Sequence, residues 1–222
     1  MASEVDICNL ALGHLGDSAT VSSLNPPEGS AQAEHCSRFY PMARDSLLEM
    51  HNWGFATKRI NLALLTSTFS EWQYCYAQPT DAVNLLAVLS SDSTDDYSVP
   101  LQYSSSVMGV AITMGGVYEP QPFSSEVLAD GTEVIYTNQA NAMLRYTALV
   151  SDTTKFNPLF VDCLSWLLAS YLAGPIIKGD AGAGEAKRCM QAFMVIFGKA
   201  AVSDASQRRT QIQQSVGWMA GR

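Results

Sequence analysis

The sequence predicts an α+β protein, mainly a helical bundle of about four helices with an antiparallel β insert and an extended C-terminal tail. Three observations support this class. The 222 residues are 47% apolar and 15% charged, which is enough apolar material to bury a core. Apolar residues keep helical spacing near both ends of the chain, whereas the middle shows the alternation and turn residues of strands. The middle is also acidic, with nine acidic residues against Arg145 alone.

These changes divide the chain into four segments. We expect an N-terminal helical pair over residues 1–59 and an acidic β-rich insert over 60–150. A C-terminal helical pair over 151–203 completes the bundle, and an extended docking tail covers 204–222. The formal charge is −3 in the first segment, with seven acidic and four basic residues, and −8 in the insert. After residue 150 it is +3, with five acidic and eight basic residues.

The first helical pair has clear start signals. Ser3 with Asp6 three residues later is typical of a capped helix start, and Ser30 is placed to cap a second helix. Pro41 predicts a kink or a break in that second helix, because its ring clashes with the preceding turn. The expected apolar stripes are Val5, Cys8, Leu12 and Leu15 in the first helix, and Cys36, Tyr40, Ala43, Leu47 and Met50 in the second.

The insert has the pattern of a small antiparallel sheet. Asp130-Gly131 is a turn signal that joins two short strands into a hairpin. Both the alternating segments and the β-branched runs are short, as expected for strands. The predicted strands are residues 72–76, 85–89, 107–113, 126–129, 133–137 and 142–150.

Helical spacing returns after residue 156. Asn157-Pro158 is a capping residue followed by proline at the first helical position, and Gly174-Pro175 predicts the end of this third helix. The glycine-rich run 179–184 is then expected to be a flexible connector. A fourth helix follows, with its apolar side formed by Ala186, Cys189, Met190, Phe193, Phe197 and Ala200.

The last segment carries three arginines against one acid and few large apolar residues. Such a segment cannot bury enough surface to order alone, so we expect it to dock on another surface. The alternative is that Trp218 folds back onto its own domain. The predicted docking residues are Arg208, Arg209, Ile212, Val216 and Trp218.

The sequence shows no motif for catalysis, metal binding or a cofactor. The glycine-rich run lacks the Gly-Lys-Ser/Thr ending of a phosphate loop, and the histidines lack the spacing of zinc ligands. The acidic run Asp92, Asp95, Asp96 lacks the spacing and the final glutamate of a calcium loop. Five scattered cysteines are expected to be small core residues. We therefore expect no enzyme activity, no metal and no cofactor.

Charge and hydropathy limit the partners. A net charge of −8 and a pI of about 4.7 disfavour tight binding of nucleic acid through its phosphates. No basic and apolar leader precedes Ser3, so synthesis in the cytoplasm is expected. The apolar stretches look too interrupted to span a membrane.

Short segments in a fixed order resemble a known family. The pattern runs over residues 1–203 and ends in two helices, 157–172 and 185–201, that match in order and length. It resembles the tail tubular protein A family, which supplies the head-to-tail adaptor of short-tailed bacteriophages. The matching residues are Cys8-Asn9-Leu10-Ala11-Leu12, Leu15-Gly16, Ala33, Arg44, Leu47 or Leu48, Trp53-Gly54-Phe55-Ala56, Arg59, Trp72-Gln73-Tyr74-Cys75-Tyr76, Pro79 and Asp81.

The resemblance implies a structural virion protein in the neck between head and tail. Twelve copies would form a dodecamer ring under the portal protein, with the insert toward tail or nozzle proteins and the C-terminal tail on the portal. DNA would pass through during ejection without specific binding, since twelve copies at −8 carry a formal −96 that repels phosphates. The expected ring or core anchors are Trp53, Phe55, Trp72, Tyr74 and Tyr76.

Two other functions stay open at this point. One is a tail-completion or neck protein at another level of the virion. The other is a small soluble enzyme whose site is assembled from dispersed residues such as His35, His51 and Asp81.

Overall fold

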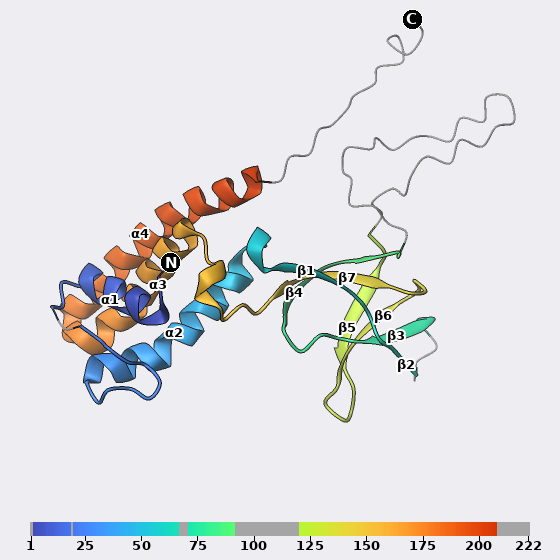
Figure 1. The fold of residues 1–222 in the computed structure, drawn as a ribbon, viewed down its shortest axis with the longest axis horizontal. Coiled ribbons are helices and arrows are strands. Elements are labelled where there is room, and N and C mark those ends of the chain that lie inside the picture. The colour runs from blue at the N-terminus through green and yellow to red at the C-terminus, as the bar shows by residue number, and fades with distance from the viewer. Residues whose placement is uncertain (1, 19, 67–70, 92–119, 208–222) are drawn as a thin grey trace, which may run out of the picture. The chain divides into compact units, whose positions relative to one another are not determined.

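The computed structural model describes residues 2–18, 20–66, 71–91 and 120–207. The structure is 49% helical and 22% strand, a mixed α and β fold with four helices and two small antiparallel sheets in the described residues (Figure 1). The helices are α1 (Glu4–His14), α2 (Ala31–Met50), α3 (Pro158–Ile177) and α4 (Gly179–Ser206), with short 3₁₀ helices η1 (Gly54–Ala56) and η2 (Thr153–Lys155). The strands are β1 (Thr57–Asn61), β2 (Leu64–Leu65), β3 (Tyr74–Ala77), β4 (Ala82–Leu89), β5 (Phe123–Val127), β6 (Glu133–Thr137) and β7 (Met143–Ala148).

The chain divides into two compact units. The helical unit comprises Met1–Thr57 and Thr147–Gln207, and the sheet unit comprises the described residues of Lys58–Tyr146. The boundaries lie after Thr57 and after Tyr146, whereas the sequence placed them after residues 59 and 150. Two segments far apart in the sequence therefore build the helical unit together.

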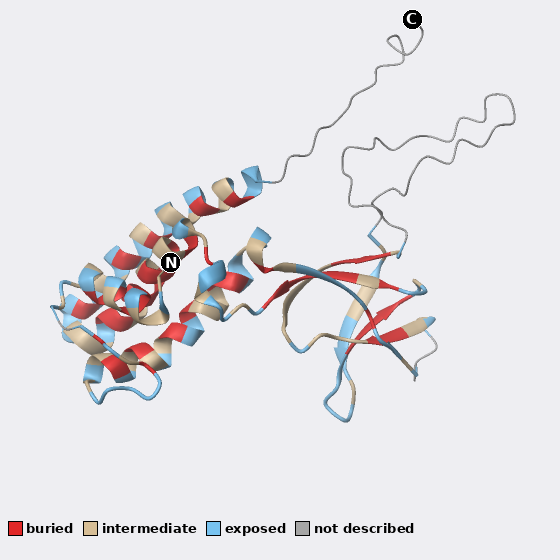
Figure 2. Ribbon diagram, viewed as in Figure 1, coloured by how far each residue is buried: buried red, intermediate tan, exposed pale blue. Residues whose placement is uncertain are grey.

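Helix α3 is the centre of the helical unit, because it packs against α1, α2 and α4. Figure 2 shows buried positions along most of its length. Apolar side chains from all four helices meet around it and form one core. The buried residues of α3 are Phe160, Cys163, Leu164, Ser165, Leu167, Leu168, Ala169, Ser170, Leu172 and Ala173.

The apolar length of α3 corrects one expectation. Pro158–Ile177 has a mean hydropathy of 1.6, so among the described helices it is long and apolar enough to cross a membrane. The view that every apolar stretch is too interrupted for a span is wrong by length and composition. Half of the helix window is buried inside the fold, as in the core helix of a packed domain.

The predicted starts of the first two helices are confirmed, and the predicted break in α2 is wrong. Ser3 and Asp6 form a reciprocal capping box at α1, and Ser30 Oγ accepts a hydrogen bond from the Ala33 amide at α2. Helix α2 continues through Pro41, whose ring lies on the exposed side. Buried residues on either side of the proline pack on one face, which offsets the lost backbone hydrogen bond of about 3 kcal/mol.

The turn between α3 and α4 corrects two further expectations. Helix α3 continues past Gly174-Pro175 to Ile177, and the glycine-rich run 179–184 is the start of α4 rather than a flexible connector. Lys178 and Gly179 take positive φ values of 62° and 60°, so two residues suffice to reverse the chain. A Cβ on Gly182 would lie 3.0 Å from the Ala173 carbonyl oxygen, so glycine there lets α4 approach α3 closely.

The end of α4 corrects the start of the expected tail. Residues 204–206 are helical, and Asp204 is buried with 4% of its surface exposed. Asp204 continues the buried side of α4 formed by Cys189, Phe193 and Ala200. Because Asp204 packs against the rest of the helical unit, α4 continues to Ser206 and does not end at Ser203 as expected.

The sheet unit contains the predicted hairpin, but its strands form two sheets instead of the single sheet that was expected. Strands β5 and β6 pair in antiparallel register across Asp130-Gly131, with Val127 opposite Glu133. The strand orders are β1-β7-β4 and β2-β3-β6-β5. Asn141, at a φ of 50°, lies in the turn after β6 and leads into β7 of the other sheet. The predicted strand 107–113 lies outside the described residues.

Candidate functional site

Trp53 lies in the core of the helical unit. It is 1% exposed, and its indole Nε1 donates a hydrogen bond to the Leu47 carbonyl oxygen at 2.8 Å. The rings of Phe160 and Trp53 meet edge to face with centroids 5.0 Å apart, and partly buried Phe55 packs on both. Of the two roles expected for Trp53, core and ring wall, the structure gives it a place in the core.

Asp204 joins the end of α4 to the segment before η1. Its carboxylate accepts hydrogen bonds from the Gly54 amide at 3.0 and 3.1 Å and lies 3.3 Å from His51 Nε2. A Cβ on Gly54 would come within 3.3 Å of Asp204 Oδ1, so the glycine leaves room for this contact. The carboxylate thus pins the last turn of α4 against residues 51–54.

Sequence analysis missed Asp204, because its composition placed it in the polar tail. A signal was present: Asp204 follows Phe193, Phe197 and Ala200 at the three- and four-residue spacing of a helix face. A charged residue at such a position indicates a polar partner on the neighbouring element.

A small pocket of about 210 Å³ lies beside this contact. Its wall includes Trp53 and Asp204, and Gln207 lines it at the end of the described chain. Asn157 and Pro158 contribute the start of α3. The pocket therefore lies at the end of α4, next to Gln207, the last residue of this described range.

All five expected docking residues lie outside the described residues. They are Arg208, Arg209, Ile212, Val216 and Trp218. The described part ends at Gln207, the C-cap of α4. Residues 204–206, which were expected in the tail, therefore belong to α4.

The three aromatic residues expected as anchors in the insert differ in burial. Tyr76 is 2% exposed, and its hydroxyl donates to the Gln139 carbonyl oxygen at 2.9 Å. Trp72 is partly buried against a small core formed by Cys75, Val134 and Tyr136. Tyr74 is partly buried, with its ring centroid 6.2 Å from that of Tyr76. These side chains build the sheet unit itself.

Two of the residues suggested for an enzyme, His35 and His51, lie far apart in the helical unit. His35 and His51 are separated by 16 residues along α2 and its end, about 24 Å at the helical rise. Asp81 belongs to the sheet unit, where Lys58 Nζ and the Tyr146 hydroxyl bind its carboxylate at 2.7 and 2.9 Å. Lys58 is the main reason that the pKa of Asp81 lies below its usual value.

The remaining candidate groups are structural where they are described. All five cysteines are free and buried, which confirms their expected place in the core. His14 stacks on Trp166 with centroids 3.7 Å apart. Among the described residues, no three His, Cys, Asp or Glu side chains cluster as metal ligands do. Asp92, Asp95 and Asp96 lie outside these residues.

Large apolar side chains are exposed on three helices of the helical unit, singly on α1 at Leu10 and in groups on α4 and α2. On α4 these are Met190, Met194, Val195 and Val202, with exposures from 37% to 71%. On α2 they are Met42 and Met50, at 56% and 51%. Exposed apolar groups on neighbouring turns are typical of surfaces that contact other molecules.

No family model and no curated protein matches this chain. The function is therefore inferred from the residues and their arrangement.

Proposed function

We propose that this chain is a structural virion protein, a head-to-tail adaptor whose copies form a ring between the portal and the tail of a bacteriophage. The helical unit acts as a helical bundle that forms the wall of the ring and part of the DNA channel. The sheet unit meets tail or nozzle proteins, and residues 208–222 bind the portal protein. The protein acts by assembly and has no catalytic role.

The exposed apolar surface of the helical unit carries this proposal. Met194, Val195 and Val202 on α4 are each more than 60% exposed, although the unit has a well-filled core beneath them. A ring subunit covers such a surface with its neighbour. The acidic net charge of −8 per copy favours a channel along which DNA slides.

The Asp204 contact fixes the end of α4, after which the proposed tail follows in sequence. Because the Asp204 carboxylate binds the Gly54 amide and lies close to His51, the last turn of α4 has a defined place in the helical unit. The segment Trp53-Gly54, part of the family resemblance, supplies the partner of that carboxylate. A short arginine- and tryptophan-containing segment released from such a point is suited to bind a partner in an extended form.

Truncation tests the proposal. The chain is mixed with the portal protein of the same phage, and the complex is measured by native mass spectrometry and electron microscopy. We expect a ring on the portal for the full chain, and no attachment after deletion of residues 208–222. The cut follows Gln207, because a cut after Ser203 also removes Asp204 and disturbs the fold.

Each outcome assigns a different role. Portal attachment that survives the deletion refutes the docking role of the tail. A chain that never joins the portal but binds tail components belongs at another level of the neck. A full chain that stays monomeric with either partner refutes the adaptor function.

A further inference from the structure

Helix α4 presents an apolar outer face, defined here as Met190, Met194, Val195 and Val202. Met194, Val195 and Val202 point away from the buried residues Cys189, Phe193 and Ala200, and Met190, 37% exposed, lies at the edge of the face nearest to them. Between residues 190 and 206 the sequence has two charged residues, buried Asp204 and exposed Lys199. Lys187 lies one turn before this face and is also exposed. The surface is thus apolar with basic residues at its edges.

Helix α2 presents a second outer face, defined as Met42, Asp45, Glu49 and Met50. Both methionines are more than half exposed, and exposed Glu49 immediately precedes Met50, the last residue of the helix. The Asp45 carboxylate is 44% exposed, although it also binds Arg44. Exposed Arg38 lies one turn before Met42 on the same side, so this surface is apolar with Asp45 and Glu49 beside the methionines and one basic residue at its N-terminal edge.

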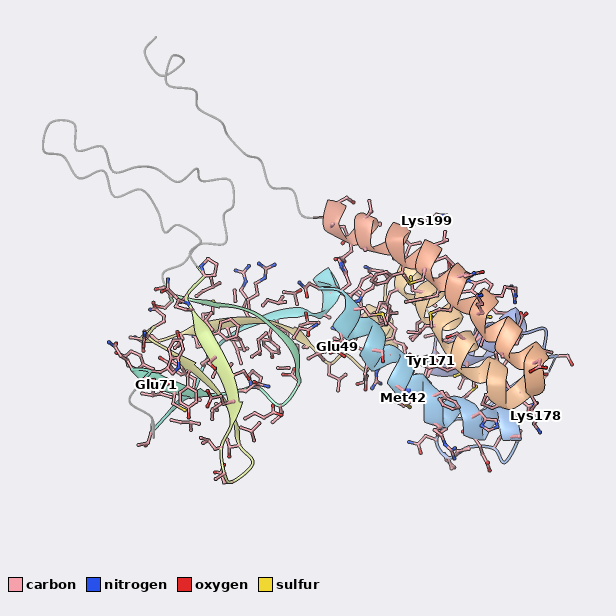
Figure 3. All side chains as sticks on the ribbon, turned by 180° about the vertical axis from the view of Figure 1, so that it is seen from behind. Met42, Glu49, Glu71, Tyr171, Lys178 and Lys199 are labelled. Atoms are coloured by element: carbon pink, nitrogen blue, oxygen red, sulfur yellow. The ribbon has the colours of Figure 1, made fainter. Side chains whose placement is uncertain are left out.

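The two faces belong to different sides of the helical unit. Helix α3 packs against both α2 and α4, and each outer face lies away from α3. In Figure 3, Lys199 lies on α4 along the upper edge of the unit, and Met42 and Glu49 lie on α2 along the lower edge. One copy therefore cannot cover one of its faces with the other.

We infer that the outer face of α4 in one copy packs on the outer face of α2 in the next copy. Methionines on both faces adapt to an irregular partner surface, and Lys187 and Lys199 meet acidic groups around Met42 and Met50. A symmetric contact between two α4 faces buries the same apolar groups but brings lysines together. The charges therefore favour the asymmetric pairing.

This contact is head-to-tail, and such contacts form a ring when the rotation between neighbouring copies closes and an open filament when it does not. The inference rests on the proposed function for the ring itself and adds which surfaces join its neighbours. Met190 to Val202 span about 18 Å of helix, so the face covers roughly 200 Å² per copy. A stable interface buries about 800 Å² per partner, so this contact alone holds free copies weakly and depends on concentration.

Cysteine cross-linking tests the pairing. Met194→Cys and Met42→Cys place single thiols on the two faces, and the five native cysteines are buried. The full-length variants are oxidised mildly at the highest soluble concentration and separated on non-reducing gels. Leu10→Cys, at an exposed position of α1, mixed with Met42→Cys is the matched control.

We expect covalent dimers from the mixture of Met194→Cys and Met42→Cys, at least tenfold above the control and above either variant alone. The double variant forms a ladder of oligomers. In the chain without introduced cysteines, we expect Met194→Glu to weaken self-association, measured by sedimentation, by about tenfold or more.

Two results overturn the inference. One is a mixture that cross-links no more than the control, and the other is equal dimer formation by Met194→Cys alone, which means a symmetric contact. The test is separate from that of the proposed function. A ladder of oligomers from a chain that does not bind the portal supports the contact between α4 and α2 and refutes the adaptor function. A ring on the portal from a double variant that forms no ladder supports the adaptor function and refutes this contact.

Discussion

Replacing Asp204 tests the contact that fixes the end of α4. In Asp204→Ala the Gly54 amide and His51 lose the carboxylate that they contact at 3.0 to 3.3 Å. Hydrogen bonds to a charged group contribute about 1.5–3 kcal/mol each to stability. Because Gly54 is exposed, water replaces part of the lost interaction with its amide. We therefore take about 3 kcal/mol as the loss in the free energy of unfolding for the whole contact.

A smaller effect acts in the opposite direction. Asp204 lies in the last turn of α4, where a negative charge opposes the helix dipole by about 0.3–1 kcal/mol. Removing the charge of Asp204 removes this unfavourable interaction, so the net loss in the free energy of unfolding is about 2 kcal/mol. In a chain of this length such a loss lowers the melting temperature by about 4–8 °C. Asp204→Asn keeps an acceptor for the Gly54 amide, so we expect about half the loss.

Urea unfolding followed by tryptophan fluorescence measures this change, because Trp53 is next to Gly54 and reports on the same region. Ser206→Ala, two residues further along the same helix end and exposed, is the matched control and should stay within about 0.5 kcal/mol of the parent chain. If Asp204→Ala is as stable as this control, the carboxylate does not hold the helix end, and the reasoning is wrong.

Three further predictions concern single positions. Gly184→Ala should stabilise α4 by up to about 1 kcal/mol because it has open space, whereas Gly182→Ala should lose about 1–2 kcal/mol at its close backbone contact; equal melting temperatures would refute this. Burial lowers the pKa of His14 from its ordinary 6.5, so the unfolded chain takes up the proton first and stability is lost as the pH falls below 6.5. His14→Gln should flatten this loss in pH-dependent melting, and an unchanged slope would assign it to other groups. Tyr76→Phe leaves the Gln139 carbonyl oxygen without its donor and should cost about 1 kcal/mol in urea unfolding; no change would mean that water replaces the hydroxyl.

The starts of the first two helices were predictable because their signals are local. The cap at Ser3 and the cap at Ser30 depend on residues within three positions, and both are present. The hairpin across Asp130-Gly131 was predictable for the same reason, with Gly131 at a φ of 86°. Short-range geometry alone decides such features.

The effects of helix-breaking residues were predicted poorly, because tertiary packing outweighs their low helix propensity. Pro41 and the glycines of 179–184 are helix breakers by propensity, yet both lie inside helices of the structure. Pro41 is exposed while its neighbours are buried, and Gly182 is needed for the close approach of α4 to α3. Neither reason is visible without the partner helix.

For the candidate site too, some features follow from the sequence alone and others depend on tertiary structure. Composition and periodicity by themselves determined the mixed fold, the capped helices, the buried cysteines and an acidic chain. Tertiary structure decided that Trp53 lies in the core, that Asp204 binds Gly54 and His51 across 150 residues of chain, and which faces of α2 and α4 stay exposed. The physical reason is that caps and turns arise between neighbours in sequence, whereas burial and polar pairing depend on which distant segments meet.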